Sequence, residues 1–283
     1  MIRLTAQDTI LDINPELAAS MWRFTDKGRD VLRPTPDGSV DTLDTGNFPL
    51  VPWCNRIRDG AFVFEGHKVK LPPNFGDSPH TLHGHGWRAA WTVIEASPTR
   101  AVLSFRHTAD AWPWDYEATV VYELRPGGVR CFLTIKNLSK GVMPAGLGFH
   151  PYFLRTPDTR LKASVDGVWL VDDQTLPRNW HAGVVRKDWT NGDRVSHDIT
   201  IDNCYTGFKG KAEIFEGDRL THTLRASPNC RWLHIFAPTH DQSYFCAEPV
   251  DHMPDPFNQP NSGLHCLKAG ATDMVWMDIA VQG

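Results

Sequence analysis

The sequence lacks three features that would assign it to common functional classes: an excess of positive charge, long apolar segments and paired cysteines. Its 29 Lys and Arg residues are outnumbered by 33 Asp and Glu residues, which gives a net charge of −4. A protein without a basic surface is not expected to bind nucleic acid or an anionic membrane. The apolar runs are also far shorter than the roughly 20 residues of a membrane-spanning helix, so we expect no membrane partner.

The cysteines and the first residues predict the cellular compartment. The six cysteines are scattered and form no CxxC pair, so neither a zinc ribbon nor a redox motif is indicated. The N-terminal stretch MIRLTAQDTILDINPELAAS has no continuous apolar segment like that of a secretory signal peptide. We therefore expect reduced thiols and a cytoplasmic location.

Alternation of apolar and polar residues dominates the rest of the chain. It runs through Glu117–Leu124 and Val129–Lys136, and Pro126-Gly127-Gly128 between them is typical of the turn of an antiparallel hairpin. The C-terminal run Val275–Val281 alternates in the same way. Further strands are expected at Trp91–Glu95, Ala101–Arg106, Leu161–Val165, His197–Ile201, Thr221–Ala226, Trp232–Phe236 and Ser243–Ala247.

These short strands predict the fold class. They recur with Gly, Pro, Asn or Asp between them, and no long segment has the 3.6-residue period of an amphipathic helix. The pattern indicates an all-β protein, a large antiparallel β-sandwich rather than alternating βαβ units. Because no internal repeat, charge block or flexible linker interrupts the pattern, we expect residues 1–283 to form a single domain.

Polar islands interrupt the strand pattern and are candidates for a binding or catalytic site. In the first, Phe48–Ile57, two prolines exclude a central strand, and Arg56 could hold a planar or anionic partner or pair with a structural carboxylate. In the second, His83 and His85 alternate with glycines. They could bind a metal, since alternate residues of a strand share a face, or contact a ligand, or lie in a solvated turn.

Two later islands contain groups suited to proton transfer. His150 lies among aromatic residues, and histidine titrates closest to neutral pH, so it could be a general acid or base or a core histidine. Glu248 ends an apolar stretch, so it could be a buried carboxylate with a shifted pKa, or it could lie on the surface at the end of a strand. Asp202 is a similar carboxylate at the end of a strand. Tryptophans near the islands could stack on sugar rings or pack in the core: Trp53, Trp87, Trp112 and Trp114.

In their order along the chain, the islands resemble the motifs of the aldose 1-epimerase (galactose mutarotase) family. The resemblance implies a galactose mutarotase-like β-supersandwich with an open cleft for a small-molecule sugar. It runs from about residue 45 to the C-terminus, and the ordered set is Asn55-Arg56-Ile57, Gly60 to Gly66, Leu82-His83-Gly84, His150-Pro151-Tyr152-Phe153, Asp202, Glu248-Pro249, Pro254-Asp255-Pro256-Phe257-Asn258 and Leu267-Lys268-Ala269-Gly270.

The resemblance also implies a reaction, the interconversion of the α and β anomers of a free aldose with no cofactor and no metal. Glu248 would be the general base for the C1 hydroxyl and His150 the general acid for the ring oxygen. After rotation about the C1–C2 bond, the reverse transfers would close the ring. His83 would hydrogen-bond the ring region, and Arg56 and Asp202 would hold sugar hydroxyls. We expect a monomer or a homodimer.

Departures from the family pattern concern the choice of sugar. His85 replaces the second glycine that many members have after the first histidine, and Val250-Asp251 follows Glu248-Pro249 where Gln-Thr is common. Arg88 could serve a sugar phosphate, as in the relatives that act on hexose 6-phosphates. The intact His150-Pro151-Tyr152 favours an unphosphorylated sugar.

Other functions fit part of the pattern. A cupin-like metalloenzyme would use His83, His85, His150 and Glu248 as metal ligands. A glycoside hydrolase would use Asp202 and Glu248 as its pair of carboxylates. A non-catalytic sugar-binding protein would keep the cleft without proton transfer.

Overall fold

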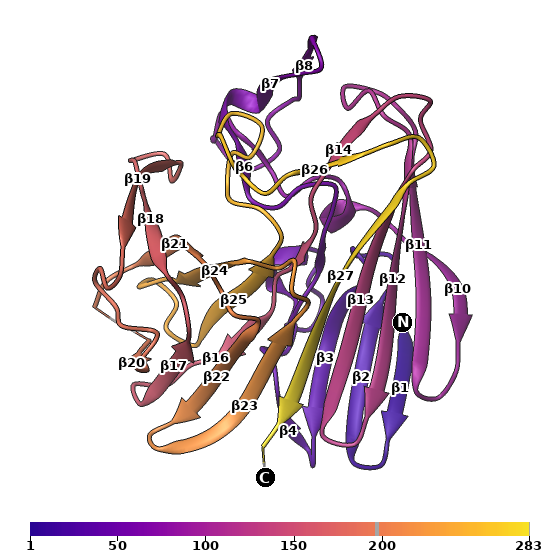
Figure 1. The fold of residues 1–283 in the computed structure, drawn as a ribbon. Helices are drawn as coiled ribbons and strands as arrows, with labels where there is room; N and C mark the ends of the chain where they lie inside the picture. Colours follow the sequence, from indigo (N-terminus) through magenta and orange to yellow (C-terminus); the bar gives the residue numbers. More distant parts are fainter. Residues whose placement is uncertain (196–197, 283) are drawn as a thin grey trace.

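Long antiparallel strands form the largest sheet of the protein (Figure 1). The computed structural model describes residues 1–195 and 198–282. Every pair of neighbouring strands in this sheet is antiparallel. Its nine strands follow the order β10 (Thr92–Ala96), β11 (Arg100–His107), β12 (Tyr116–Arg125), β13 (Gly128–Asn137), β27 (Thr272–Val281), β23 (Arg219–Ala226), β22 (Lys211–Glu216), β17 (Thr159–Ala163) and β20 (Asp193–Arg194).

A second large sheet carries most of the candidate site residues. Strand β25 lies inside it, between β24 on one side and β15 and β16 on the other. Strand β5 lies at its edge, as the prolines of the first island predict. Its strands are β19 (Pro177–Ala182), β18 (Gly167–Val171), β21 (Ile201–Thr206), β24 (Trp232–Ala237), β25 (Tyr244–Val250), β15 (Gly148–Phe149) and β5 (Pro49–Leu50), with β16 (Tyr152–Leu154) also paired to β25.

Smaller elements complete the fold. A four-stranded sheet contains β1 (Ile2–Ala6), β2 (Thr9–Asn14), β3 (Ser20–Asp26) and β4 (Arg29–Asp30). Two-stranded sheets join β14 (Met143–Ala145) to β26 (His265–Leu267), β6 (Arg56–Ile57) to β9 (Thr81–Leu82), and β7 (Ala61–Phe64) to β8 (His67–Lys70). The helical elements of the described residues are short 3-10 turns: η1 (Thr42–Asp44), η2 (Arg58–Gly60) and η3 (Gly86–Arg88).

The structure confirms the predicted hairpin. Arg125 of β12 pairs with Gly128 of β13, which leaves Pro126 and Gly127 as the turn. Gly127 has a φ of 69°, a conformation that glycine adopts without the steric cost of a side chain. The apolar faces of both strands, which the alternation placed together, are buried.

The strand predicted at His197–Ile201 is wrong. The strand in this region is β21, which begins at Ile201, and His197 lies outside the described residues. Residues 198–200 are exposed and form a bend, so they bury no face against a sheet. The other strands expected from alternation each overlap an observed strand.

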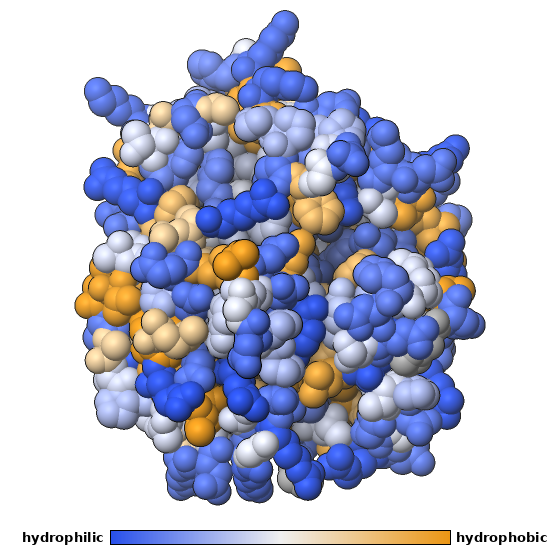
Figure 2. All heavy atoms as spheres, turned by 180° about the vertical axis from the view of Figure 1, so that it is seen from behind, coloured by the Kyte–Doolittle hydropathy of each residue, from blue (hydrophilic) through white to orange (hydrophobic). Residues whose placement is uncertain are grey.

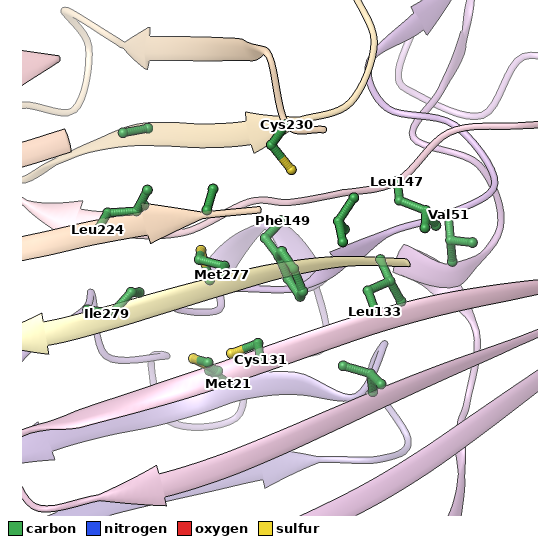
Figure 3. Packing of buried hydrophobic residues seen from close by; sticks show 14 of the residues in the cluster. Met21, Val51, Cys131, Leu133, Leu147, Phe149, Leu224, Cys230, Met277 and Ile279 are labelled. Atoms are coloured by element: carbon green, nitrogen blue, oxygen red, sulfur yellow. The ribbon is translucent and has the colours of Figure 1, made fainter. Parts of the chain in front are cut away.

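The hydrophobic core lies between the sheets. Figure 3 shows Met21 of β3, Cys131 and Leu133 of β13, Phe149 of β15 and Met277 of β27 close together, and all five are fully buried. They come from distant parts of the sequence, so this packing holds the site-bearing sheet against the nine-stranded sheet.

One charged residue of β27 is buried. Asp278 lies between the buried residues Met277 and Ile279. Its two carboxylate oxygens accept hydrogen bonds from Arg125 at 2.7 Å and from Arg130 at 2.9 Å. A buried carboxylate that stays ionised needs partners of this kind.

The surface is mainly polar. Figure 2 shows hydrophilic residues over most of one face, with hydrophobic residues in scattered groups. Within residues 1–195 and 198–282, no helix has the length and apolar character needed to cross a lipid bilayer.

Candidate active site

Strand register places three polar side chains in one row of the second sheet. Cys204 of β21 pairs with His234 of β24, and His234 pairs with Glu248 of β25. Directly paired residues point to the same face of a sheet, and so do residues two apart on one strand. Asp202 therefore shares this face with Glu248, because it lies two residues before Cys204.

His150 reaches Glu248 from the link between β15 and β16. Its backbone N–H donates to the carbonyl of Phe48, at 3.1 Å. Its ring stacks between Phe48 and Tyr152, with a centroid distance of 4.7 Å to each. This places His150 Nε2 at 3.4 Å from Glu248 Oε1, with both residues buried.

Arg33 packs against Tyr152, one of the two rings that stack on His150. The Arg33 guanidinium carbon lies 3.9 Å from the centre of the Tyr152 ring and 4.3 Å from that of Tyr244. Arg33 also donates to the carbonyls of Leu43 and, at 3.2 Å, Thr45. Cation–π contacts of this kind fix the ring against which the imidazole stacks.

His83, which directly follows β9, and Arg56, which begins β6, come from two segments joined by hydrogen bonds. The backbone N–H of Asn55 donates to Nδ1 of His83 at 3.0 Å, and the His83 N–H donates to the Asn55 carbonyl at 2.9 Å. Next to His83, Gly84 has a φ of 73°, and a Cβ there would lie 2.2 Å from the Val51 carbonyl oxygen. The glycine is therefore required for the close approach of the two segments.

The five residues predicted for the site line one cavity of about 260 Å³. Arg56, His83, His150, Asp202 and Glu248 all contribute to its wall. This size is slightly below the about 300–1,000 Å³ of pockets for drug-sized ligands, so it suits a small ligand. A larger hollow of about 410 Å³ beside β4 and β23 contains none of the five. The remaining lining residues of the smaller cavity are Leu43, Asn55, Phe75, Leu82, Tyr152, His234, Phe236, His240 and Tyr244.

Burial shifts the pKa values of Glu248 and His150 in opposite directions. It raises the pKa of the Glu248 carboxyl to about 8, with a further contribution from Asp202 and opposition from His234 and Arg56. Burial lowers the pKa of His150 to about 3, and charged His234 acts in the same direction. Near neutral pH the pair therefore holds one proton, which these shifts place on Glu248.

His234 and Asp202 form an ion pair beside this dyad. His234 Nε2 lies 2.7 Å from Asp202 Oδ1, and Arg56 Nη1 lies 3.9 Å from Asp202 Oδ2. Burial alone would lower the pKa of His234, but hydrogen bonds to Asp202 and Cys204 and the nearby Glu248 raise it to about 10. Burial would raise the pKa of Asp202, but His234 and Arg56 lower it. Both members are therefore charged at neutral pH.

His83 is held as a neutral hydrogen-bond donor. Burial lowers its pKa well below the usual value, and the nearby His150 and Arg56 act in the same direction. Because Nδ1 accepts the Asn55 N–H, the ring proton is on Nε2. This tautomer can donate one hydrogen bond to a ligand oxygen.

His234 is the main site residue that sequence reasoning missed. It lies in the predicted strand Trp232–Phe236, where local alternation gives no sign of its partners. A histidine between Leu233 and Ile235, on a strand that buries its neighbours, was the available signal. The aromatic wall formed by Phe75, Phe236 and Tyr244 was also missed.

Several residues near the islands lie elsewhere. His85 is not among the lining residues; its Nδ1 is 3.0 Å from the Tyr116 hydroxyl and its ring stacks on His107. A metal site that combines His83 with His85 is therefore wrong. Arg88 is exposed, with its guanidinium over the Trp87 ring. The four tryptophans near the islands are buried in packing contacts and do not line the cavity: Trp53, Trp87, Trp112 and Trp114.

Two residues of the cavity wall, His150 and Glu248, form a group of potential metal ligands with Cys246, which is not among the lining residues. Ligand atoms of His150, Cys246 and Glu248 lie within 4.8 Å of one another. Burial raises the pKa of the Cys246 thiol well above its usual value, so the thiol is protonated. Since a metal needs the thiolate, this group is better suited to proton transfer than to a metal.

Comparison with known proteins agrees with this arrangement. The sequence pattern described as "Aldose 1-epimerase" matches residues 18–279. The chain is 28% identical to the uncharacterized protein YphB of Escherichia coli K12, over 96% of this chain and 95% of YphB. It is 30% identical to the uncharacterized protein YihR of the same organism, over 89% of this chain and 83% of YihR.

Solved structures share the whole fold. A proposed aldose 1-epimerase from Escherichia coli K12 superposes with a TM-score of 0.91 at 26% identity, over 99% of this chain and 98% of that one. A galactose mutarotase-like protein from Clostridium acetobutylicum gives 0.85 at 23% identity, over 99% and 94%. The fold is thus the predicted all-β, galactose mutarotase-like sandwich, and the chain belongs to the aldose 1-epimerase family.

Proposed function

We propose that the protein is a mutarotase that interconverts the α and β anomers of a free aldose. The observation that supports this most directly is the contact between Glu248 and His150, 3.4 Å apart in a cavity of about 260 Å³. Anomer exchange needs one group that takes a proton while another gives one, followed by the reverse. A pair that holds one proton between two sites meets that need.

The pair has two protonation states. One state can open the sugar ring, and the other can close it. With the proton on His150, Glu248 takes the C1 hydroxyl proton while His150 Nε2 protonates the ring oxygen, and the ring opens to the aldehyde. The dyad then has its proton on Glu248, the position that the two pKa shifts favour. After rotation about the C1–C2 bond, Glu248 returns a proton to the aldehyde oxygen while His150 accepts the proton of the attacking hydroxyl.

Surrounding groups would hold the sugar during these transfers. Asp202 is kept anionic by His234 and Arg56 and can accept hydrogen bonds from hydroxyl groups. Arg56 and His83 Nε2 can donate to ring or hydroxyl oxygens. Tyr152, Phe236 and Tyr244 provide the apolar faces against which the C–H side of a sugar ring packs.

The direct test is a panel of freshly dissolved pure anomers, followed by polarimetry or by NMR exchange. We expect the enzyme to accelerate equilibration of at least one free aldose above the buffer rate. Sugar binding without acceleration would instead support a non-catalytic protein, and release of the aglycone from an aryl glycoside would support a hydrolase. The free state of all six cysteines supports the further proposal that the protein works in the cytoplasm.

A further inference from the structure

A second cluster of titratable groups lies outside the cavity, where three strands meet. Asp251 directly follows β25, His265 begins β26 and Asp273 is the second residue of β27. Each offers one ligand atom, and the three atoms lie within 4.8 Å of one another. The residues come from different strands, so the cluster depends on the tertiary fold rather than on local sequence.

Asp251 brings an unused oxygen to the cluster. The residue is 1% exposed, and its Oδ1 accepts the backbone N–H of Leu147 at 2.9 Å. The backbone N–H of Asp251 donates to the Leu147 carbonyl at 3.1 Å, so the two residues are joined by a backbone bond as well as through the carboxyl group. Asp251 Oδ2 is buried and has no hydrogen-bond partner among the described residues. An unpaired buried carboxyl oxygen is costly unless a ligand uses it.

The other two groups open the cluster to solvent. His265 Nδ1 is hydrogen-bonded to Asp273 Oδ2, and the side chains are 33% and 19% exposed. Asp273 Oδ1 accepts the N–H of Met274 at 2.8 Å, which orients the carboxylate. An ion can therefore enter from the surface and meet the fixed oxygen of Asp251 at the inner end.

We propose that Asp251, His265 and Asp273 bind a divalent transition-metal ion, with Zn²⁺ as the best match. One imidazole and two carboxylates form a donor set that zinc accepts, and a water molecule would fill a fourth position. Donor atoms on a tetrahedral zinc ion are roughly 3.3 Å apart, given bonds of about 2.0 Å. The three ligand atoms lie within 4.8 Å of one another, and the ion would take the place of the hydrogen bond between His265 and Asp273.

The proposed site has a structural consequence. The bound ion would join the end of β25, which carries Glu248, to β26 and β27.

Neighbouring clusters are less suited to an ion. Cys54 and His252 also lie near Asp251, but His252 Nε2 accepts the Cys54 N–H at 3.0 Å and Nδ1 is 2.8 Å from the Met253 carbonyl. Both nitrogens of His252 are therefore in use. A further group combines His85 and His107 with Asp110, whose side chain is 64% exposed.

The test measures Zn²⁺ binding to the full chain after treatment with chelator and dialysis, by calorimetry and by metal analysis. We expect one tightly bound equivalent. Excess Zn²⁺ at a hundred times Kd should raise Tm by roughly 5 °C. Binding should be lost in Asp273→Asn and His265→Gln, with circular dichroism to verify folding. Asp110→Asn, a matched change in the other cluster, and Glu248→Gln should both keep the equivalent.

The outcomes separate this proposal from the proposed mutarotase activity, on which it does not depend. No binding by the folded wild-type protein, or binding that Asp273→Asn leaves unchanged, would overturn it. Loss of the ion in Asp110→Asn or Glu248→Gln would place the ion elsewhere and would also overturn it.

Discussion

Replacing Glu248 by Gln and His150 by Asn, singly and together, tests whether the two groups act as one unit. The first change keeps the size of the side chain, the second replaces the ring by a smaller polar amide, and each removes the group's part in proton transfer. We expect each single variant to lose at least about a hundredfold in mutarotation rate, which is about 2.7 kcal/mol of transition-state stabilisation.

The double variant is the sharper measurement. The two groups are 3.4 Å apart and hold one proton between them, so removing either one ends the exchange. We therefore expect the double variant to lie within about threefold of the slower single variant, because residues that act as a unit are not additive. Independent groups would give a product of about ten thousandfold from the same single losses.

The assay follows the optical rotation or the NMR anomer exchange of a fresh aldose, with the buffer rate subtracted. Glu65→Gln and His67→Asn, at the exposed turn between β7 and β8, are matched controls and should keep the wild-type rate. A near-normal rate in either single variant would refute the role of that residue. A double variant whose loss of rate equals the product of the two single losses would refute the shared proton.

The other predictions concern pH, substrate binding and stability. We expect a bell-shaped plot of kcat/KM against pH. The rate should be constant while the Glu248–His150 pair holds one proton and should fall above about pH 8, where the pair loses that proton. A flat profile from pH 6 to pH 10 would contradict this. Asp202→Asn removes an anionic acceptor and should lower kcat/KM roughly ten- to hundredfold, the value of a charged hydrogen bond; unchanged steady-state kinetics would exclude Asp202 from binding. Phe149→Ala should lower the free energy of unfolding by about 3–5 kcal/mol, measured by guanidinium titration, because the ring is fully buried in the core; a loss under about 1 kcal/mol would mean that the core rearranges around the gap.

Local alternation was sufficient to predict most of the strands and the fold class. The β12–β13 hairpin could be predicted because both strands and their turn are contiguous in the sequence. The strand at His197–Ile201 was misplaced because the buried alternation belongs to the residues from Ile201 onward. In that region the position of the strand depends on pairing with β18 and β24, which is not visible locally.

The candidate site was predictable only in part, for the same physical reason. Polar residues in apolar or turn-rich surroundings identified Glu248, His150 and His83 before the structure was known. His234 could not be paired with Asp202 from the sequence, because their contact depends on the register between β21 and β24. His85 shared the pattern of His83, yet its side chain contacts Tyr116 instead of the cavity.

Some residues of the cavity wall lie on long paired strands, and others lie on short strands or loops. This difference bears on how the range of bound ligands could change. Glu248, His234 and Asp202 are anchored in paired strands, whose backbone hydrogen bonds leave their spacing little freedom. Arg56, Phe75 and His83 are supplied by short strands and loops, where exchanges and insertions disturb fewer backbone bonds. If the proposed activity holds, engineering of new sugar preferences should therefore begin in the loops, since remodelling there leaves the proposed proton-transfer pair in place.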